Sequence, residues 1–97
     1  MMNYLETIKH ELEILKPELT TKFYVDTIGL FGSVIRKDFS DKSDIDIIVN
    51  FSRPVGIEFI DLANFLELKF HRKIDLISKK GIKANYFAEI EKDIIYV

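Results

Sequence analysis

Apolar positions repeat along this chain with two different periods, and the change from one period to the other predicts where helices and strands alternate. Residues 3–16 carry apolar side chains at steps of three and four, which predicts an amphipathic helix with one core-facing stripe. The stripe consists of Leu5, Ile8, Leu12 and Leu15. We expect Pro17 to end this helix or to begin a second short one, because proline suits the first position of a helix.

Runs rich in β-branched and aromatic residues follow, and such runs are typical of strands. The run at 44–51 is almost continuously apolar from Ile45 to Val49, as expected of a central strand. The predicted fold class is α+β, a two-layer α/β arrangement in which helices pack on one face of a small mixed sheet of three to four strands. The expected strands are 24–31, 44–51, 73–78 and a last short strand or tail at 94–97, and the later helices are 33–37, 57–70 and 85–92.

The helix expected at 57–70 has a wide apolar surface. Leu62 and Phe65 extend this surface sideways from one apolar face. We expect most of the surface to face the core, with a dimer or partner contact as the alternative, so a homo-oligomer stays open. The members of the main face are Phe59, Ile60, Ala63, Leu66 and Phe70.

Length and composition narrow the class of protein. The chain has 97 residues, which predicts a single domain over 1–97. It has no cysteine, which fits a reducing cytosol, and we expect a cytoplasmic protein. No apolar run approaches the roughly 18 residues of a membrane span, so no membrane contact is expected. The formal net charge of −2 does not mark a nucleic-acid binder.

The triplet Asp44-Ile45-Asp46 opens the strand expected at 44–51 and carries the first candidate chemistry. Side chains alternate between faces along a strand, so Asp44 and Asp46 project from the same face. Two neighbouring carboxylates repel each other, and a bound divalent cation removes that conflict. Oxygen ligands suit Mg²⁺ or Mn²⁺. The alternative is a solvated pair that makes a turn or a helix cap, whereas a calcium loop needs an oxygen ligand in place of Ile48 and a glycine in place of Val49.

A Gly32-Ser33 pair stands between the first expected strand and the short helix at 33–37, with ten residues between Ser33 and Asp44. Glycine permits a close approach of the backbone, and Ser33 can cap the following helix through its hydroxyl. Amides at the start of that helix would favour an anion. The order strand, Gly-Ser, short helix and acidic strand therefore predicts a site for phosphate and metal.

Asp75 lies in the strand expected at 73–78, between Ile74 and Leu76. A carboxylate inside an apolar strand is costly to bury without a partner. A third metal ligand beside the acidic triplet explains its position, and the alternative is an ion pair with Arg72 or Lys73.

Residues 69–83 are strongly basic, with six Lys or Arg residues, one His and one acid. Such a segment fits contact with phosphates or with an acidic partner, and it equally fits a solvated surface. The two histidines, His10 and His71, have no spaced Cys or His partners, so a zinc site is not expected.

The two motifs together resemble the signature of the DNA polymerase beta-like nucleotidyltransferase superfamily. The segments Leu30-Phe31-Gly32-Ser33-x-x-Arg36 and Ser43-Asp44-Ile45-Asp46-Ile47-x-Val49 are similar to its smallest branch, the minimal nucleotidyltransferases encoded beside HEPN-domain toxins. The resemblance extends over almost the whole chain and implies a nucleotidyltransferase-like core. Lys37 departs from it, because family members often carry Gly after the Arg.

The resemblance implies a protein adenylyltransferase that moves AMP from ATP, or NMP from another NTP, onto a tyrosine of a HEPN toxin and so acts as its antitoxin. The implied catalytic and metal-binding residues are Asp44, Asp46 and Asp75, which would hold two Mg²⁺ ions, or Mn²⁺. The residues expected to contact the nucleotide phosphates are Gly32, Ser33 and Arg36.

Two other functions remain open from the sequence. A binding module would neutralise its partner by covering it, but the presence of all three carboxylates favours an enzyme. Transfer onto RNA fits the basic segment, but beyond core candidates the chain shows no cluster of aromatic residues for stacking bases. A chain of 97 residues leaves no room for an acceptor-binding domain, so we expect a small acceptor or a separate protein.

Overall fold

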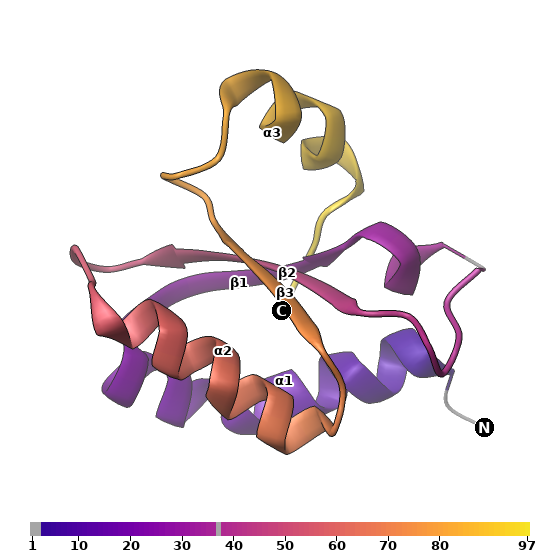
Figure 1. The fold of residues 1–97 in the computed structure, drawn as a ribbon, viewed down its shortest axis with the longest axis horizontal. Coiled ribbons are helices and arrows are strands. Elements are labelled where there is room, and N and C mark those ends of the chain that lie inside the picture. The colour runs from indigo at the N-terminus through magenta and orange to yellow at the C-terminus, as the bar shows by residue number, and fades with distance from the viewer. Residues whose placement is uncertain (1–2, 37) are drawn as a thin grey trace.

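The computed structural model describes residues 3–36 and 38–97 (Figure 1). It has the predicted α+β fold with a small mixed sheet. Lys37, the position that departs from the family pattern, lies outside the described residues. In chain order the elements are α1 (Tyr4–Phe23), β1 (Val25–Phe31), the 3-10 helix η1 (Gly32–Ile35), β2 (Ile45–Phe51), α2 (Ile57–Phe70), β3 (Ile74–Ser78), α3 (Ala84–Ile90), the 3-10 helix η2 (Glu91–Asp93) and β4 (Ile95–Tyr96).

The strands lie in the order β3-β2-β1-β4. Strand β1 pairs antiparallel with both β2 and β4, whereas β2 and β3 are parallel and are joined by α2. A parallel pair needs such a crossover, because the chain has to return to the same end of the sheet before the next strand begins. The crossover leaves β2 in the centre and β3 at one edge.

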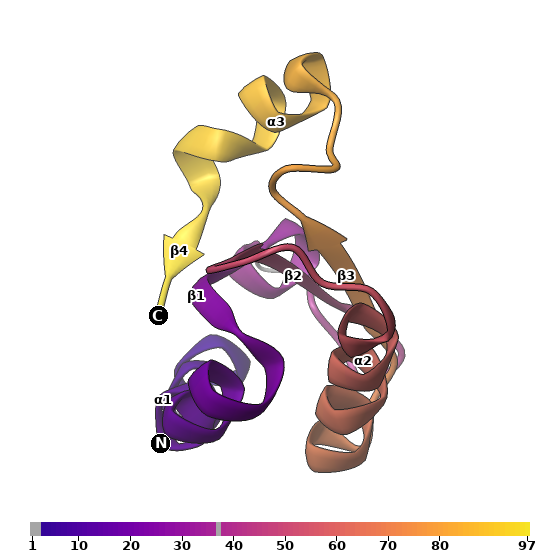
Figure 2. The same cartoon turned by 90° about the vertical axis from the view of Figure 1, so that its left-hand side faces the viewer.

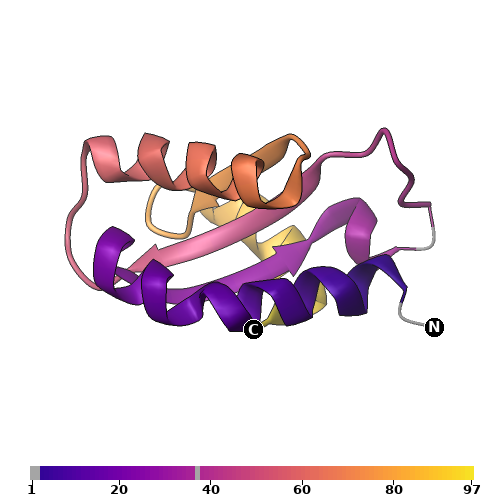
Figure 3. The same ribbon diagram turned by 90° about the horizontal axis from the view of Figure 1, so that it is seen from below.

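The helices α1 and α2 lie side by side against one face of the sheet, and Figure 3 shows them from that side. The Phe23 and Phe65 rings, one from each helix, have centroids 5.1 Å apart. The core between helices and sheet includes Leu12, Leu19, Ile28, Leu30, Ile45, Ile47, Leu62 and Leu66. The short helix α3 stands on the opposite side of the sheet (Figure 2). In the described part of the chain, no helix is long and apolar enough to cross a membrane.

The prediction that Pro17 ends the first helix is wrong, because α1 continues unbroken from Tyr4 to Phe23. Pro17 is on the exposed side of the helix, and Leu19 and Phe23 continue the buried stripe beyond it. Burial of these two side chains compensates for the backbone hydrogen bond that proline cannot donate. The Thr21 hydroxyl donates a hydrogen bond to the Pro17 carbonyl oxygen at 2.9 Å.

The face of α2 that packs on the sheet also differs from the predicted one. Leu62 and Leu66 are fully buried, whereas Ile60 is 55% exposed. When apolar residues surround most of a helix, the sequence alone does not show which face packs against the core. The crossover between β2 and β3 fixes that choice, and it leaves Ile57, Ile60 and Leu68 exposed.

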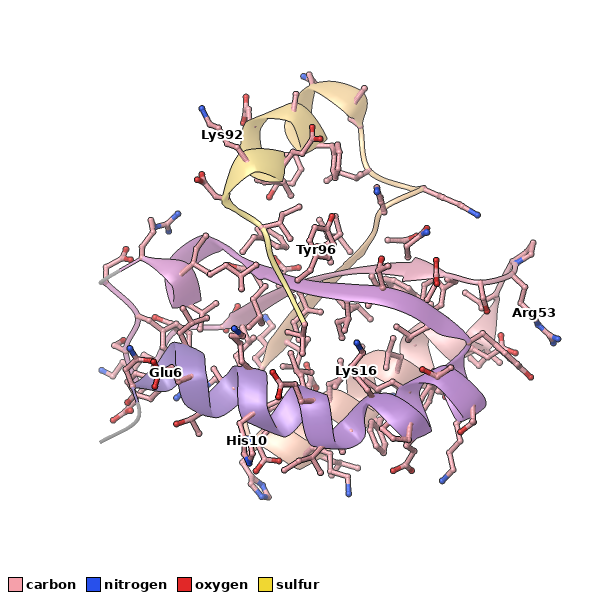
Figure 4. The ribbon with its side chains drawn as sticks, turned by 180° about the vertical axis from the view of Figure 1, so that it is seen from behind. Glu6, His10, Lys16, Arg53, Lys92 and Tyr96 are labelled. Carbon is pink, nitrogen blue, oxygen red and sulfur yellow. The ribbon has the colours of Figure 1, made fainter. Side chains whose placement is uncertain are left out.

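The C-terminal segment returns to the sheet beside β1, and this return holds α3 and η2 above the sheet. Strand β4 pairs Tyr96 with Gly29, where a Cβ atom would lie 2.6 Å from the Ile94 side chain. Only glycine permits this close approach. The Lys16 ammonium donates a hydrogen bond to the Val97 carbonyl oxygen at 2.9 Å, and Figure 4 shows Lys16 and Tyr96 on this side of the molecule.

Candidate active site

The predicted alternation along β2 is present in the structure. Ile45 and Ile47 are fully buried on the face that packs against the helices. Asp46 is partly buried and Ile48 is 2% exposed, and both belong to the opposite face by the alternation of strand side chains. Asp44 is exposed and immediately precedes the strand. Asp44 therefore lies just before the first residue of β2, and Asp46 lies at the boundary of the apolar surface.

The register of the sheet brings Asp46 and Asp75 together. Asp46 is paired with Phe31 in the antiparallel ladder to β1 and with Asp75 in the parallel ladder to β3. The two aspartates are thus directly adjacent on neighbouring strands, on the same face. The side chain of Asp75 is within hydrogen-bonding contact of the Asp46 carboxyl group.

Two sequence-based arguments about Asp75 are wrong. Asp75 is exposed, so the cost of burying a carboxylate does not explain its position. In the residues that the structure describes, the ion pairs are Lys22 with Glu18 and Arg36 with Asp38, so Asp75 has no ion pair with Arg72 or Lys73. Strand β3 is at the edge of the sheet, and its polar face opens to solvent there.

The surroundings of Asp46 shift the pKa of its carboxyl group. Its pKa is raised to about 6, first by burial and then by the negative charge of Asp75. A hydrogen bond from the backbone N–H of Ser33 opposes the rise, and Asp44 adds a smaller repulsion. The carboxylates therefore repel one another in the absence of a cation, as expected when such groups share one site.

Gly32 makes this arrangement of Asp46 sterically feasible. It has a positive φ of +73°, and a Cβ atom at this position would lie 2.9 Å from the Asp46 Cγ. Any larger residue would displace the carboxylate or the backbone. Ser33 lies within η1, not at its cap, and its N–H group contacts Asp46. The expectation that the Ser33 hydroxyl caps the helix is therefore wrong, because η1 has no side-chain cap.

A cleft of about 530 Å³ opens in front of Gly32 and Asp46, a size that is typical of small-molecule sites. Arg36 lies on its rim, with Nε 3.4 Å from the Asp38 carboxylate. Its far wall comes from α3 and η2, to which the sequence assigned no role, because only the pairing of β4 with β1 brings that segment here. The lining residues are Phe31, Gly32, Ile35, Arg36, Asp46, Tyr86, Glu89, Ile90 and Asp93.

Arg72 holds the loop that leads into Asp44. Its Nη1 donates hydrogen bonds to the carbonyl oxygens of Ser40 and Ser43 at 2.8 and 2.9 Å. The guanidinium group lies 4.8 Å from the centroid of the Phe39 ring, which makes an edge contact with Tyr4. The loop is thus attached to α1 and to the turn between α2 and β3, just before the acidic triplet.

The oxygen donors fit a hard divalent cation whose remaining coordination positions are filled by a bound ligand. In residues 3–36 and 38–97, no three His, Cys, Asp or Glu side chains are placed to hold a metal ion by themselves. Mg²⁺ is commonly held by one or two carboxylates together with substrate phosphates, not by an all-protein cage. The adjacent Asp46 and Asp75 carboxylates, next to an open cleft, have this composition.

Comparison with known proteins shows the family of this chain. The profile of a family described as "Nucleotidyltransferase domain" matches residues 12–97. The chain belongs to the nucleotidyltransferase domain family. A protein of Thermococcus cleftensis named protein adenylyltransferase MntA is 35% identical over 94 residues, covering 96% of this chain and 95% of the relative. A protein of Methanocaldococcus jannaschii, provisionally named a protein adenylyltransferase, is 38% identical over 98 residues, covering 99% of this chain and 100% of the relative.

Solved structures of nucleotidyltransferases share the fold. One provisionally described as a minimal nucleotidyltransferase has a TM-score of 0.80 at 23% identity, covering 96% of this chain and 95% of that one. A chain from a crystal structure of the toxin-antitoxin MntA-HpeT has a TM-score of 0.70 at 20% identity, covering 98% of this chain and 72% of that one. The family and the enzyme class that the two sequence motifs predicted, nucleotidyltransferase, are confirmed.

Proposed function

We propose that this nucleotidyltransferase moves AMP from ATP onto a hydroxyl group of a separate protein and thereby acts as an antitoxin in the cytoplasm. The proposed acceptor is a tyrosine of a HEPN-domain toxin. The observation that carries the proposal is the pairing of Asp46 with Asp75 beside Gly32 at the mouth of the cleft.

The metal-binding residues in this proposal are Asp44, Asp46 and Asp75, together with the nucleotide phosphates. Two Mg²⁺ ions, or Mn²⁺, would neutralise the charge of the triphosphate and of the attacking oxygen. The raised pKa of Asp46 supports this assignment, because the charge of Asp75 contributes to the rise after burial, and a nearby cation relieves that repulsion. Asp44, which is exposed at the start of β2, is free of strand pairing and can turn toward the phosphates.

Gly32, Ser33 and Arg36 are the proposed contacts to the nucleotide phosphates. Gly32 and Arg36 both line the cleft, and the absence of a side chain at Gly32 leaves space for a ligand near Asp46. The Ser33 N–H group is engaged by Asp46, so its hydroxyl is the group that remains for a phosphate oxygen. Arg36 is exposed on the rim, where its guanidinium group can pair with phosphate oxygens.

The proposed transfer is an in-line displacement at the α-phosphorus. The hydroxyl oxygen of the acceptor forms a bond to the α-phosphorus while the bond from that phosphorus to the oxygen bridging the β-phosphate breaks. Pyrophosphate leaves, and the hydroxyl proton passes to Asp75. Exposure of Asp75 at the edge of the sheet supports its role as the base, because an acceptor from solution can reach it there.

A protein acceptor is supported by the names of the relatives. The Thermococcus cleftensis relative is named a protein adenylyltransferase, and it aligns with almost the whole of this chain. A structural neighbour belongs to a toxin-antitoxin pair.

Transfer of label is the direct test of the proposed function. The purified protein is incubated with Mg²⁺ and each of the four α-labelled NTPs in turn, with the product of the neighbouring gene as acceptor. We expect label from ATP on a tyrosine of that protein, and no label with the Asp44→Asn variant. A tight complex without label would contradict the proposed transfer and would instead support an antitoxin that acts by binding.

A further inference from the structure

Strand β3 has one side that is free of strand pairing, because it is the first strand in the order of the sheet. The Ile45 N–H donates to the Lys73 carbonyl, and the Lys79 N–H donates to the Val49 carbonyl. Alternate residues of a parallel strand bond to the same neighbour, so the N–H and C=O groups of Leu76 point away from β2. A free edge of this kind can pair with an extended segment of another chain.

An apolar groove of about 560 Å³ runs beside this edge. It is lined by side chains from α2, from β3 and from the segment that leads into α3. Tyr86 lines both this groove and the cleft in front of Asp46, so the two spaces adjoin each other. The groove residues on which the inference rests are Phe59, Leu76, Ile77, Ile82, Lys83 and Tyr86.

The spacing along β3 links the groove to the proposed base. Asp75 and Ile77 lie on the same face of the strand, roughly 7 Å apart at about 3.3 Å per residue. A segment paired with the edge of β3 has the same spacing between its alternate residues. When an apolar side chain of such a segment fills the groove, the residue two positions away in that segment therefore lies beside Asp75.

Charge around the edge favours an acidic segment. Lys73 and Lys79 flank β3, and Lys83 lines the groove on the segment toward α3, all of them exposed. The described residues from 69 to 83 contain one acid, Asp75. A rim of one charge around an apolar centre selects a partner of the opposite charge and steers its approach.

We infer that the groove and the free edge of β3 bind an acidic, extended segment of the acceptor protein. An apolar side chain of that segment occupies the groove, and the hydroxyl-bearing residue two positions away meets Asp75. The inference rests on the proposed function, which supplies the role of Asp75, and it adds the surface and the chemistry by which the acceptor is chosen.

The test uses two groove variants and a matched control. The variant Lys83→Glu reverses a charge that lines the groove, and a glutamate at this position is compatible with the start of α3. Ile82→Ser removes an apolar wall that is not part of the main core. The control, Lys9→Glu, reverses one charge on α1, and thermal unfolding shows that each variant is folded.

The probe is the product of the neighbouring gene, tested as the proposed acceptor. Its Kd is measured in an Asp46→Asn background, where no transfer occurs, and its KM in the active protein. We expect both groove variants to raise the Kd and the KM about tenfold or more, with an unchanged kcat and an unchanged Kd for ATP. The control is expected to stay within about twofold of the unmodified protein, since a rim charge elsewhere contributes little.

Each other outcome has a definite meaning. Unchanged Kd and KM for the partner would overturn the inference, and a raised Kd for ATP would show that the nucleotide occupies the groove instead. Loss of self-association in the variants would assign the groove to a second copy and also overturn it. Partner binding that depends on the groove, without any transfer by the unmodified protein, would sustain the inference and overturn the proposed transfer. A protein that neither binds nor modifies this partner would overturn both.

Discussion

Gly32 lies so close to Asp46 that a Cβ atom at position 32 would stand 2.9 Å from the Asp46 Cγ and 3.2 Å from its Cβ. The two residues come from the end of one strand and the start of the next, and the register of the sheet brings them together. The Gly-Ser motif and the acidic triplet are therefore a single steric unit, although ten residues separate them in the sequence.

Replacement of Gly32 by alanine should damage activity more than stability. The positive φ costs an alanine about 1–2 kcal/mol, and the added Cβ displaces the Asp46 carboxylate. We expect the transfer rate to fall about a hundredfold or more, because an error of about 1 Å in a catalytic group has an effect of this size. Single-turnover transfer and thermal unfolding measure the two effects.

Gly56→Ala is the matched control for this prediction. A Cβ atom at Gly56 would meet nothing within 4 Å, so the position has space for alanine. The control should retain full activity. Equal losses in the two variants would mean that the close contact between Gly32 and Asp46 has no special role.

The pH dependence of stability should reveal the repulsion around Asp46. Its pKa of about 6 in the folded protein exceeds the ordinary value of 3.8, so between these values the folded state binds more protons than the unfolded state. The contribution of Asp46 to stability therefore falls as the pH rises from about 4 to 6, and the loss is complete above this window. A shift of this size corresponds to roughly 3 kcal/mol, which solvent screening reduces to about 1 kcal/mol.

Asp46→Asn removes this titration and should be more stable than the unmodified protein by about 1 kcal/mol at pH 8 in EDTA, with no gain below pH 4. Added Mg²⁺ should stabilise the unmodified protein at pH 8 and leave the variant unchanged. Urea unfolding at several pH values gives the free energies, and Asp61→Asn, at an exposed position of α2, provides the control. Parallel stability curves for the unmodified protein and Asp46→Asn would refute the raised pKa of Asp46.

Arg72 should act on the site through the loop before Asp44. Arg72→Lys keeps the charge but loses the fork that contacts the Ser40 and Ser43 carbonyls. We expect the Mg²⁺ concentration for half-maximal transfer to rise about tenfold, as for other supporting contacts around metal ligands. A Mg²⁺ titration of the transfer rate measures this directly.

Arg53→Lys is the control for Arg72→Lys. Arg53 stacks on the Tyr24 ring at 3.9 Å in a turn far from the acidic triplet, and Figure 4 shows it at the edge of the molecule. Its replacement should leave the Mg²⁺ dependence unchanged. If Arg72→Lys also left it unchanged while lowering thermal stability, the contacts of Arg72 would be purely structural.

The sequence predicted the features that depend on local pattern. Strand alternation placed Asp46 and Ile48 on one face of β2 and Ile45 and Ile47 on the other, because that period is set by the backbone. Asp75 was chosen as a site residue because of the cost of burying a carboxylate. This reason is wrong, since Asp75 is exposed. Its position opposite Asp46 follows from the parallel register, which local sequence does not encode.

The features that the sequence missed depend on tertiary contacts. Pro17 is tolerated inside α1 because Leu19 and Phe23 find a core to pack against. The far wall of the cleft, with Glu89 and Asp93, comes from a short helix without a motif. It reaches the site because Gly29 lets the C-terminal strand pack closely on β1, and the glycine alone did not indicate that partner.

The most direct test of the Asp46–Asp75 centre is single-turnover transfer by Asp75→Asn, with ATP binding measured on the same sample. Asp75 is exposed at a sheet edge, so its amide variant should fold normally. We predict that ATP still binds in the presence of Mg²⁺ and that transfer falls about a thousandfold, equivalent to about 4 kcal/mol of transition-state stabilisation. Transfer at the rate of the unmodified protein would contradict the assignment of Asp75 and, with it, the account of this site.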